Sequence, residues 1–247
     1  QVPAEIDPDH YDSLVDIFDQ SIQTYGDKDA FINMGKTLTF RQLDDRANQL
    51  AHYLQSRGVG QGDHVGLYLY NCNEYLEGTL ACFKIRAVPI NINYRYVADE
   101  LVYIFDNADI VACLHGREFI PELDKVREHL PQLKTFISVD DDTREPLEKI
   151  GAIEYEAALQ GNSVARDFDK RSGDDLFIIY TGGTTGMPKG VMWPHEELFY
   201  AGLGGMAPQH PDGPITAPHQ VADRIDPNFQ PVCAALAPLM HGASWWA

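Results

Sequence analysis

Apolar side chains recur at helical spacing in two stretches near the start of the chain. Their positions are Leu14, Ile17, Phe18 and Ile22, followed by Leu43, Ala47, Leu50, Ala51 and Leu54. Asp12 or Ser13 is expected to cap the first helix. Thr39-Phe40-Arg41-Gln42 has the form of a capping box for the second helix, which should end at Gly58.

Short apolar runs alternate with further helical patterns along the first 140 residues. The expected strands lie at 30–34, 37–39, 64–70, 87–92, 110–114 and 135–139, and the expected later helices at 73–85, 97–106 and 119–129. The first two strands should form a hairpin that turns across Gly35-Lys36. A strand, a helix and a strand in succession make a βαβ unit, whose two strands are parallel. The pattern therefore predicts an α/β fold with parallel-rich sheets flanked by helices.

The regular pattern stops at residues 161–175, which are polar and irregular. This stretch is predicted to link a first α/β lobe, residues 1–172, to the start of a second lobe, residues 173–247. A later stretch, 204–231, contains six prolines and no periodicity, and is expected to be a long surface loop. A strand at 233–238 should follow it.

The composition narrows the possible partners. Nineteen Lys and Arg against 37 Asp and Glu give a formal charge of -18, which argues against nucleic acid because its binding depends on neutralising phosphates with basic side chains. No apolar run is long enough to span a membrane. Four scattered cysteines without a Cys-x-x-Cys pair predict free thiols and a cytoplasmic location. The acidic run 140–142 is expected to be a solvated turn rather than a metal site, and no metal ligand is predicted in the chain.

The residues best suited to chemistry lie between Tyr180 and Val191, in the sequence YTGGTTGMPKGV. Glycines let a backbone approach an anion closely, threonines offer hydroxyls, and Lys189 supplies a positive charge, so the stretch predicts a phosphate-binding loop. Apolar runs on both sides indicate a strand, the loop and a second strand. A Walker A loop is excluded, because Gly190 stands where that motif needs Ser or Thr at the start of a helix. A hairpin turn without a ligand is the alternative.

This stretch resembles the signature loop of the adenylate-forming superfamily, which includes acyl-CoA synthetases, luciferases and the adenylation domains of peptide synthetases. Residues 87–96 (AVPININYRY) resemble an upstream segment of the fatty-acyl and steroid-acyl CoA ligases, and residues 237–242 (APLMHG) resemble the segment that lines their acyl pocket. Gly182 departs from the pattern, since many members have serine there, and one hydroxyl contact to phosphate is lost.

The resemblance implies the N-terminal portion of the large adenylating domain and the use of ATP, Mg2+ and CoA. It implies activation of a long-chain or steroid side-chain carboxylic acid to an acyl-adenylate and then to acyl-CoA. The residues that match the phosphate-binding positions are Thr181, Gly182, Gly183, Thr184, Thr185, Gly186 and Lys189. Lys189, Thr184 and Thr185 are the expected catalytic residues among them. Met240, His241 and Gly242 are expected at the acyl group, with a histidine that simply ends a strand as the alternative for His241.

Two further expectations concern the extent of the chain. The first residue is Gln1 and the last residues are apolar, so we expect a piece of a longer protein. Members of the superfamily use a downstream glutamate, aspartate and C-terminal lysine that no segment here resembles, so this piece alone is not expected to make acyl-CoA. A non-catalytic nucleotide- or acyl-binding module remains the alternative function, and a homo-oligomer remains open.

Overall fold

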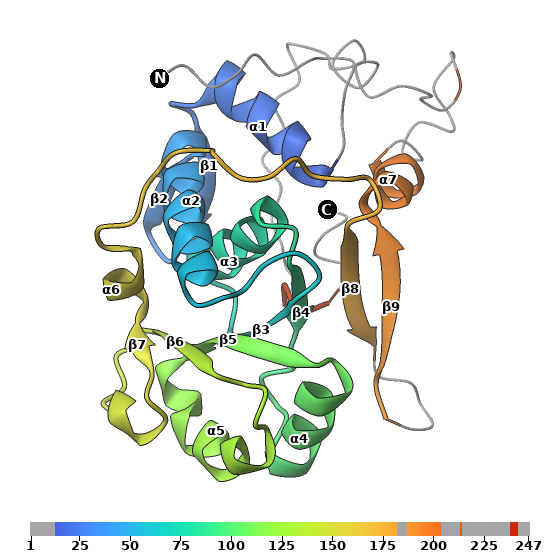
Figure 1. Cartoon of the computed structure of the whole chain (residues 1–247). Helices are drawn as coiled ribbons and strands as arrows, with labels where there is room; N and C mark the ends of the chain where they lie inside the picture. Colours follow the sequence, from blue (N-terminus) through green and yellow to red (C-terminus); the bar gives the residue numbers. More distant parts are fainter. Residues whose placement is uncertain (1–12, 182–186, 204–212, 214–237, 242–247) are drawn as a thin grey trace.

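A computed structural model describes residues 13–181, 187–203, 213 and 238–241 (Figure 1). Its main sheet has the strand order β7-β6-β5-β3-β4-β8-β9. The strands are β3 (His64–Tyr68), β4 (Val88–Asn91), β5 (Ile110–Gly116), β6 (Thr135–Val139), β7 (Ile153–Glu154), β8 (Leu176–Thr181) and β9 (Lys189–Pro194). Neighbours are parallel except for the antiparallel pair β8 and β9. The predicted α/β class with a parallel-rich sheet is confirmed.

Helices cover both faces of this sheet. They are α1 (Leu14–Tyr25), α2 (Phe40–Ser56), α3 (Asn73–Lys84), α4 (Ala98–Asn107), α5 (Ile120–Val126), α6 (Tyr155–Leu159) and α7 (His195–Leu198). Adjacent residues of a strand point to opposite faces. Thus Leu114 packs with α2, α3 and α6, whereas Cys113 packs with α4 and α5. Figure 1 shows these two layers above and below the strands.

The predicted start of α2 is confirmed in detail. The backbone N–H of Gln42 donates to Thr39 Oγ1 at 3.2 Å, and the N–H of Thr39 donates to Gln42 Oε1 at 3.0 Å. These two bonds satisfy backbone donors that the first helical turn leaves unpaired. Ser13 precedes α1 as expected, and Gly58, at φ 84°, follows the end of α2.

The hairpin forms one residue earlier than predicted. Its strands are β1 (Asp29–Asn33) and β2 (Lys36–Thr39), and Met34 and Gly35 make the turn with φ values of 48° and 79°. A two-residue hairpin turn with positive φ at both positions suits the twist of the strands, and glycine is the residue that adopts this backbone most readily. The expected helix at 119–129 is also shorter, because 3-10 turns at Arg117–Phe119 and Arg127–His129 flank α5.

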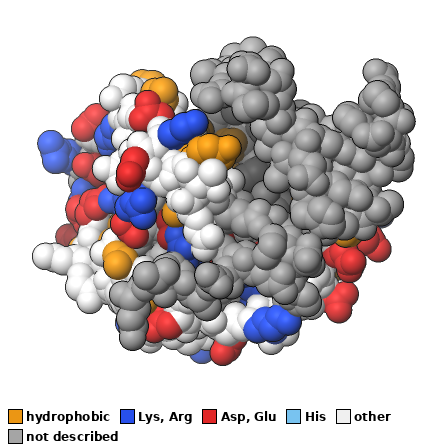
Figure 2. All heavy atoms as spheres, turned by 90° about the horizontal axis from the view of Figure 1, so that it is seen from above, with side chains coloured by type: hydrophobic (Ala, Val, Ile, Leu, Met, Phe, Trp, Pro, Cys, Tyr) orange, Lys and Arg blue, Asp and Glu red, His pale blue; other side chains and the backbone are white. Residues whose placement is uncertain are grey.

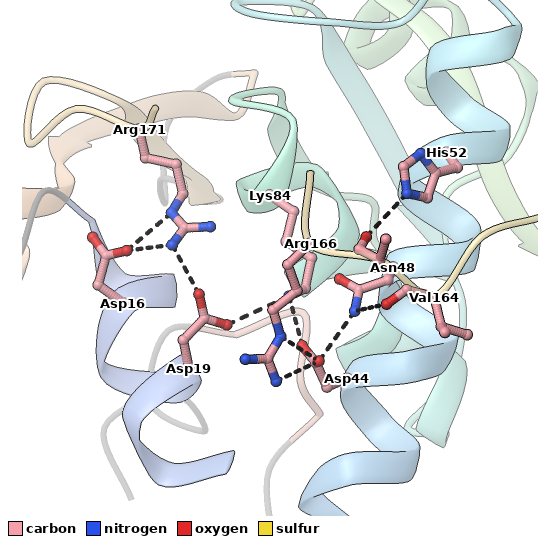
Figure 3. Close-up of polar contacts among 10 residues, drawn as sticks. Asp16, Asp19, Asp44, Asn48, His52, Lys84, Val164, Arg166 and Arg171 are labelled. Atoms are coloured by element: carbon pink, nitrogen blue, oxygen red, sulfur yellow. Dashed lines mark hydrogen bonds and ion pairs between the residues drawn. The ribbon is translucent and has the colours of Figure 1, made fainter. Parts of the chain in front are cut away.

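Ion pairs hold the irregular segment 160–175 to helices α1 and α2 (Figure 3). Arg166 contacts Asp44 of α2 at 2.7 Å. Arg171 contacts Asp16 and Asp19 of α1. Lys84 of α3 lies between the two groups, with Nζ 2.6 Å from Asp44 Oδ1 and 3.6 Å from Asp19 Oδ1. A network of three carboxylates and three cations therefore joins α1, α2, α3 and the segment. Its members are Asp16, Asp19, Asp44, Lys84, Arg166 and Arg171.

The described cysteines are free thiols. Cys82 and Cys113 are free and buried, as predicted, and Cys72 is free and partly buried. Within the acidic run, the carboxylate of Asp141 accepts the N–H of Glu118 at 2.8 Å. None of the described helices is long and apolar enough to cross a membrane. Figure 2 shows acidic and basic side chains interspersed over the described part of the upper face.

The division into lobes at residues 172 and 173 stays a prediction. Strands β8 and β9 follow that boundary and extend the same sheet as β3 and β4. The predicted loop at 204–231 lies outside the described residues apart from residue 213, and the predicted strand at 233–238 lies outside them apart from residue 238.

Candidate functional site

The two strands that flank the predicted phosphate loop form an antiparallel hairpin. Thr181, the last residue of β8, lies directly opposite Lys189, the first residue of β9. Lys189 is exposed. Strand β8 runs parallel to β4, so the hairpin closes at the carboxyl edge of the parallel strands. That edge is where open α/β sheets bind their ligands. Two residues predicted to contact phosphate are therefore brought together at a suitable edge.

A close contact below this pair explains one glycine of the motif. Gly190 lies opposite Tyr180, and a Cβ at Gly190 would be 3.0 Å from the Tyr180 ring and 3.0 Å from Ile178 Cγ2. A larger side chain would displace the ring. The Tyr180 hydroxyl in turn donates to Asn107 Oδ1 of α4 at 2.9 Å.

Helix α4 also holds the second arm of the hairpin. The Tyr103 hydroxyl donates to the carbonyl oxygen of Pro188 at 2.9 Å, one residue before Lys189. Tyr103 and Asn107 lie one helical turn apart, so one side of α4 contacts both arms of the hairpin. The hairpin arms are thereby fixed against a helix that packs on the sheet.

The second predicted site segment, residues 238–241, lies beside β4 and β8 (red in Figure 1). Leu239 and Met240 are buried, and His241 is exposed. The N–H of Leu239 donates to Asn71 Oδ1 at 2.7 Å, and Asn91 Nδ2 donates to the carbonyl oxygen of Met240 at 2.6 Å. His241 is thus held at the same carboxyl edge as Thr181.

Met240 lines a small cavity of about 10 Å³ between α3, β3, β4 and β8. Its lining is largely apolar and includes Leu67, Phe177 and Ile179. Pockets for drug-sized ligands usually measure roughly 300 to 1,000 Å³. This cavity is therefore too small to hold an acyl chain, and the acyl-site roles of Met240 and His241 stay predictions.

Several predicted site residues lie outside the described part of the chain. They are Gly182, Gly183, Thr184, Thr185, Gly186 and Gly242. Their expected contacts with phosphate or the acyl group stay predictions. The described part brings together Thr181, Lys189, Met240 and His241.

His195 lies in the core. It is buried at the start of α7, and its ring packs edge-on against Phe83 with centroids 4.5 Å apart. Burial lowers its pKa from 6.5 to about 4, although the neighbouring carboxylates of Asp175 and Asp16 oppose the shift. Buried His115 of β5 has its pKa lowered to about 4 for the same main reason. Both imidazoles are therefore neutral at pH 7.

Comparison with protein families decides the relationship that the motifs suggest. The model of a family described as "AMP-binding enzyme" matches residues 18–247, which is nearly the whole chain. The chain belongs to this family. This match includes the phosphate loop, residues 87–96 with Asn91, and residues 237–242 with His241.

Curated relatives of this AMP-binding chain are CoA ligases. It is 43% identical over 235 residues to a 3-oxocholest-4-en-26-oate–CoA ligase of Rhodococcus rhodochrous, covering 95% of this chain and 42% of the relative. It is 38% identical over 232 residues to a medium/long-chain-fatty-acid–CoA/3-oxocholest-4-en-26-oate–CoA ligase of Mycolicibacterium smegmatis, covering 94% and 42%. The chain thus spans less than half the length of these relatives.

Solved structures agree with the fold. The anthranilate CoA ligase AuaEII in complex with anthranoyl-AMP matches with a TM-score of 0.71 at 25% identity, over 80% of this chain and 38% of that one. The N-terminal domain of FACL13 from Mycobacterium tuberculosis matches with a TM-score of 0.69 at 24% identity, over 80% and 48%. The second similarity concerns the fold alone.

Three residues at this edge were not predicted from the sequence: Asn71, Asn91 and Tyr103. Asn91 lies inside the motif 87–96, but its partners Tyr180 and Met240 are 89 and 149 residues away. An asparagine at the end of a buried strand indicates a polar contact, but the sequence does not identify the contacting residue. No sequence pattern indicates the hydrogen bond of Tyr103, because aromatic residues on amphipathic helices are usually packing residues.

Proposed function

We propose that the whole protein is an AMP-forming acid–thiol ligase that activates a long-chain or steroid side-chain carboxylic acid. The observation that carries the proposal is the pairing of Thr181 with Lys189 at the carboxyl edge, in a chain that matches the AMP-binding family over residues 18–247. The activities named for the curated relatives support the choice of acids.

The proposed reaction has two steps. A carboxylate oxygen of the acid attacks the α-phosphorus of ATP, a carbon–oxygen–phosphorus linkage forms, and the bond to pyrophosphate breaks. The sulfur of CoA then attacks the acyl carbon, AMP leaves, and the thiol proton passes to solvent. The nucleophile of each step belongs to a substrate, so the contribution of the protein is positioning and charge neutralisation.

Each site residue has a role in this proposal. The Lys189 ammonium, the backbone amides of 181–186 and the hydroxyls of Thr181, Thr184 and Thr185 would hold the β- and γ-phosphates of ATP. Met240 and His241, with Gly242, would lie beside the acyl group, since the buried Met240 offers an adaptable apolar surface.

Magnesium would neutralise part of the phosphate charge. In the described ranges no three His, Cys, Asp or Glu side chains gather closely enough to hold a metal ion, so we assign no magnesium ligand to them. The cytoplasmic location is part of the proposal and is supported by the free thiols of Cys82 and Cys113, which fit a reducing compartment.

The test is a substrate panel on the full-length protein. Pyrophosphate release is measured with ATP and Mg2+ and with octanoate, palmitate, 3-oxocholest-4-en-26-oate or anthranilate, followed by thioester formation after CoA is added. We expect release with palmitate or the steroid acid and little with anthranilate. Release with anthranilate alone would refute the substrate class. Nucleotide binding without acid-dependent release would favour the non-catalytic binding module.

A further inference from the structure

Two asparagines at the carboxyl edge hold the backbone of segment 238–241. Asn71 follows β3, and Asn91 ends β4, the neighbouring parallel strand. Asn71 Oδ1 accepts the N–H of Leu239 at 2.7 Å, and Asn91 Nδ2 donates to the carbonyl oxygen of Met240 at 2.6 Å. Both bonds are to main-chain atoms, so they fix the path of the segment that carries His241.

Asn91 also contacts the phosphate-loop hairpin. Its Oδ1 accepts the N–H of Tyr180 at 2.8 Å, and its Nδ2 donates to the carbonyl oxygen of Tyr180 at 3.2 Å. The ladder between β4 and β8 has Ile90 opposite Ile178, and at Tyr180 the carboxamide takes the place of ladder hydrogen bonds. Tyr180 precedes Thr181, so Asn91 anchors the first arm of the phosphate-loop hairpin.

Few side chains could replace this carboxamide. A carboxamide has one acceptor oxygen and two N–H donors. Here the oxygen accepts from Tyr180 and the nitrogen donates to the carbonyl oxygens of Tyr180 and Met240. Aspartate at position 91 would keep the acceptor but would turn a carboxylate oxygen towards two carbonyl oxygens. Leucine would lose all three bonds at similar size.

We propose that Asn91 is a positioning residue that sets the phosphate-loop hairpin against the segment of His241. This proposal rests on the proposed function. The carboxylate of the acid must reach the α-phosphorus of ATP in line, and a misplacement of about 1 Å can cost roughly 100-fold in rate. A side chain bonded to both segments controls that alignment without touching either substrate.

The test compares Asn91→Asp and Asn91→Leu in the full-length protein, with separate KM values for ATP and for the acid, kcat of acid-dependent pyrophosphate release, and Tm. For both variants we expect both KM values to rise and kcat to fall about 10- to 100-fold.

A matched control is Asn162→Asp, which loses a 2.8 Å amide bond to the carbonyl oxygen of Ala158 at the end of α6. Its kinetics should equal those of the unmodified protein. Asn91→Asp with a lowered Tm but unchanged kinetics would overturn the proposal, because Asn91 would then serve stability alone. If Asn91→Leu does not fold, the contrast between Asn91→Asp and Asn162→Asp decides. Failure of the proposed function itself would show as no acid-dependent release by the unmodified protein.

Discussion

Lys84 offers a direct test of what the buried charge network contributes to stability. Its side chain is 0% exposed, and Nζ lies 2.6 Å from Asp44 Oδ1 (Figure 3). Lys84→Met keeps an unbranched apolar side chain of similar size and removes the ammonium group with its charge and its hydrogen bond to Asp44. Asp44 would still contact Arg166, and Asp19 would still contact Arg171, but the cluster would carry one uncompensated negative charge.

The expected loss follows from burial. Removing one partner of a buried ion pair typically costs about 3 to 5 kcal/mol, because the remaining charge stays away from water. For a domain of 150 to 250 residues each kcal/mol lowers Tm by roughly 2 to 4 °C, so a fall of about 6 to 20 °C is expected. The retained arginine contacts favour the lower half of that range.

The assay is thermal unfolding of the full-length protein, read as Tm. The matched control is Lys125→Met, whose Nζ also lies 2.6 Å from a carboxylate, Glu122, but whose side chain is 58% exposed. Such surface pairs contribute about 0 to 1 kcal/mol. Equal losses in the two variants would refute the reasoning, because the shortest charge-to-charge distance is the same and the burial differs.

Three further predictions concern other parts of the molecule. Burial lowers the folded-state pKa values of His195 and His115 from 6.5 to about 4. As the pH falls below about 6.5, these histidines bind protons in the unfolded chain but not in the folded one, so stability present above about pH 6.5 should be lost as the pH falls towards 4. Urea midpoints at pH 7.5 and 5 measure this, and an unchanged midpoint in His195→Gln relative to the parent at both values would contradict it. Tyr103→Phe removes the hydroxyl bond to Pro188 and should raise the KM of ATP about 3- to 10-fold, with the KM of the acid as the control; no change would mean that α4 does not fix the hairpin. His241→Ala should raise the KM of the acid, and a loss confined to ATP would remove His241 from the acyl site.

The sequence predicts the elements of this fold well where local chemistry decides them. The Thr39 capping box forms as expected, and the βαβ pattern yields a parallel sheet. The predicted hairpin turn at Gly35-Lys36 lies one residue after the observed turn at Met34 and Gly35, because several registers satisfy the same apolar pattern.

The sequence likewise predicts only part of the candidate site. The strands around the phosphate loop follow from its apolar flanks. The bonds of Asn91 to Tyr180 and Met240 do not follow from any local pattern, because tertiary contacts between residues far apart in sequence depend on the order of the strands. Likewise, the ion pairs of segment 160–175 appear in the sequence only as charged residues in an irregular stretch.

The central claim, that the loop closed by Thr181 and Lys189 binds the triphosphate of ATP, is tested most directly by Lys189→Ala in the full-length protein. Acid-dependent pyrophosphate release is measured over a range of ATP concentrations, with Lys125→Ala as the control for loss of one exposed lysine charge. Removing one charge-stabilising group should lower adenylation by about one to three orders of magnitude, while the control stays unchanged. Pyrophosphate release by Lys189→Ala equal to that of the unmodified protein would contradict the claim.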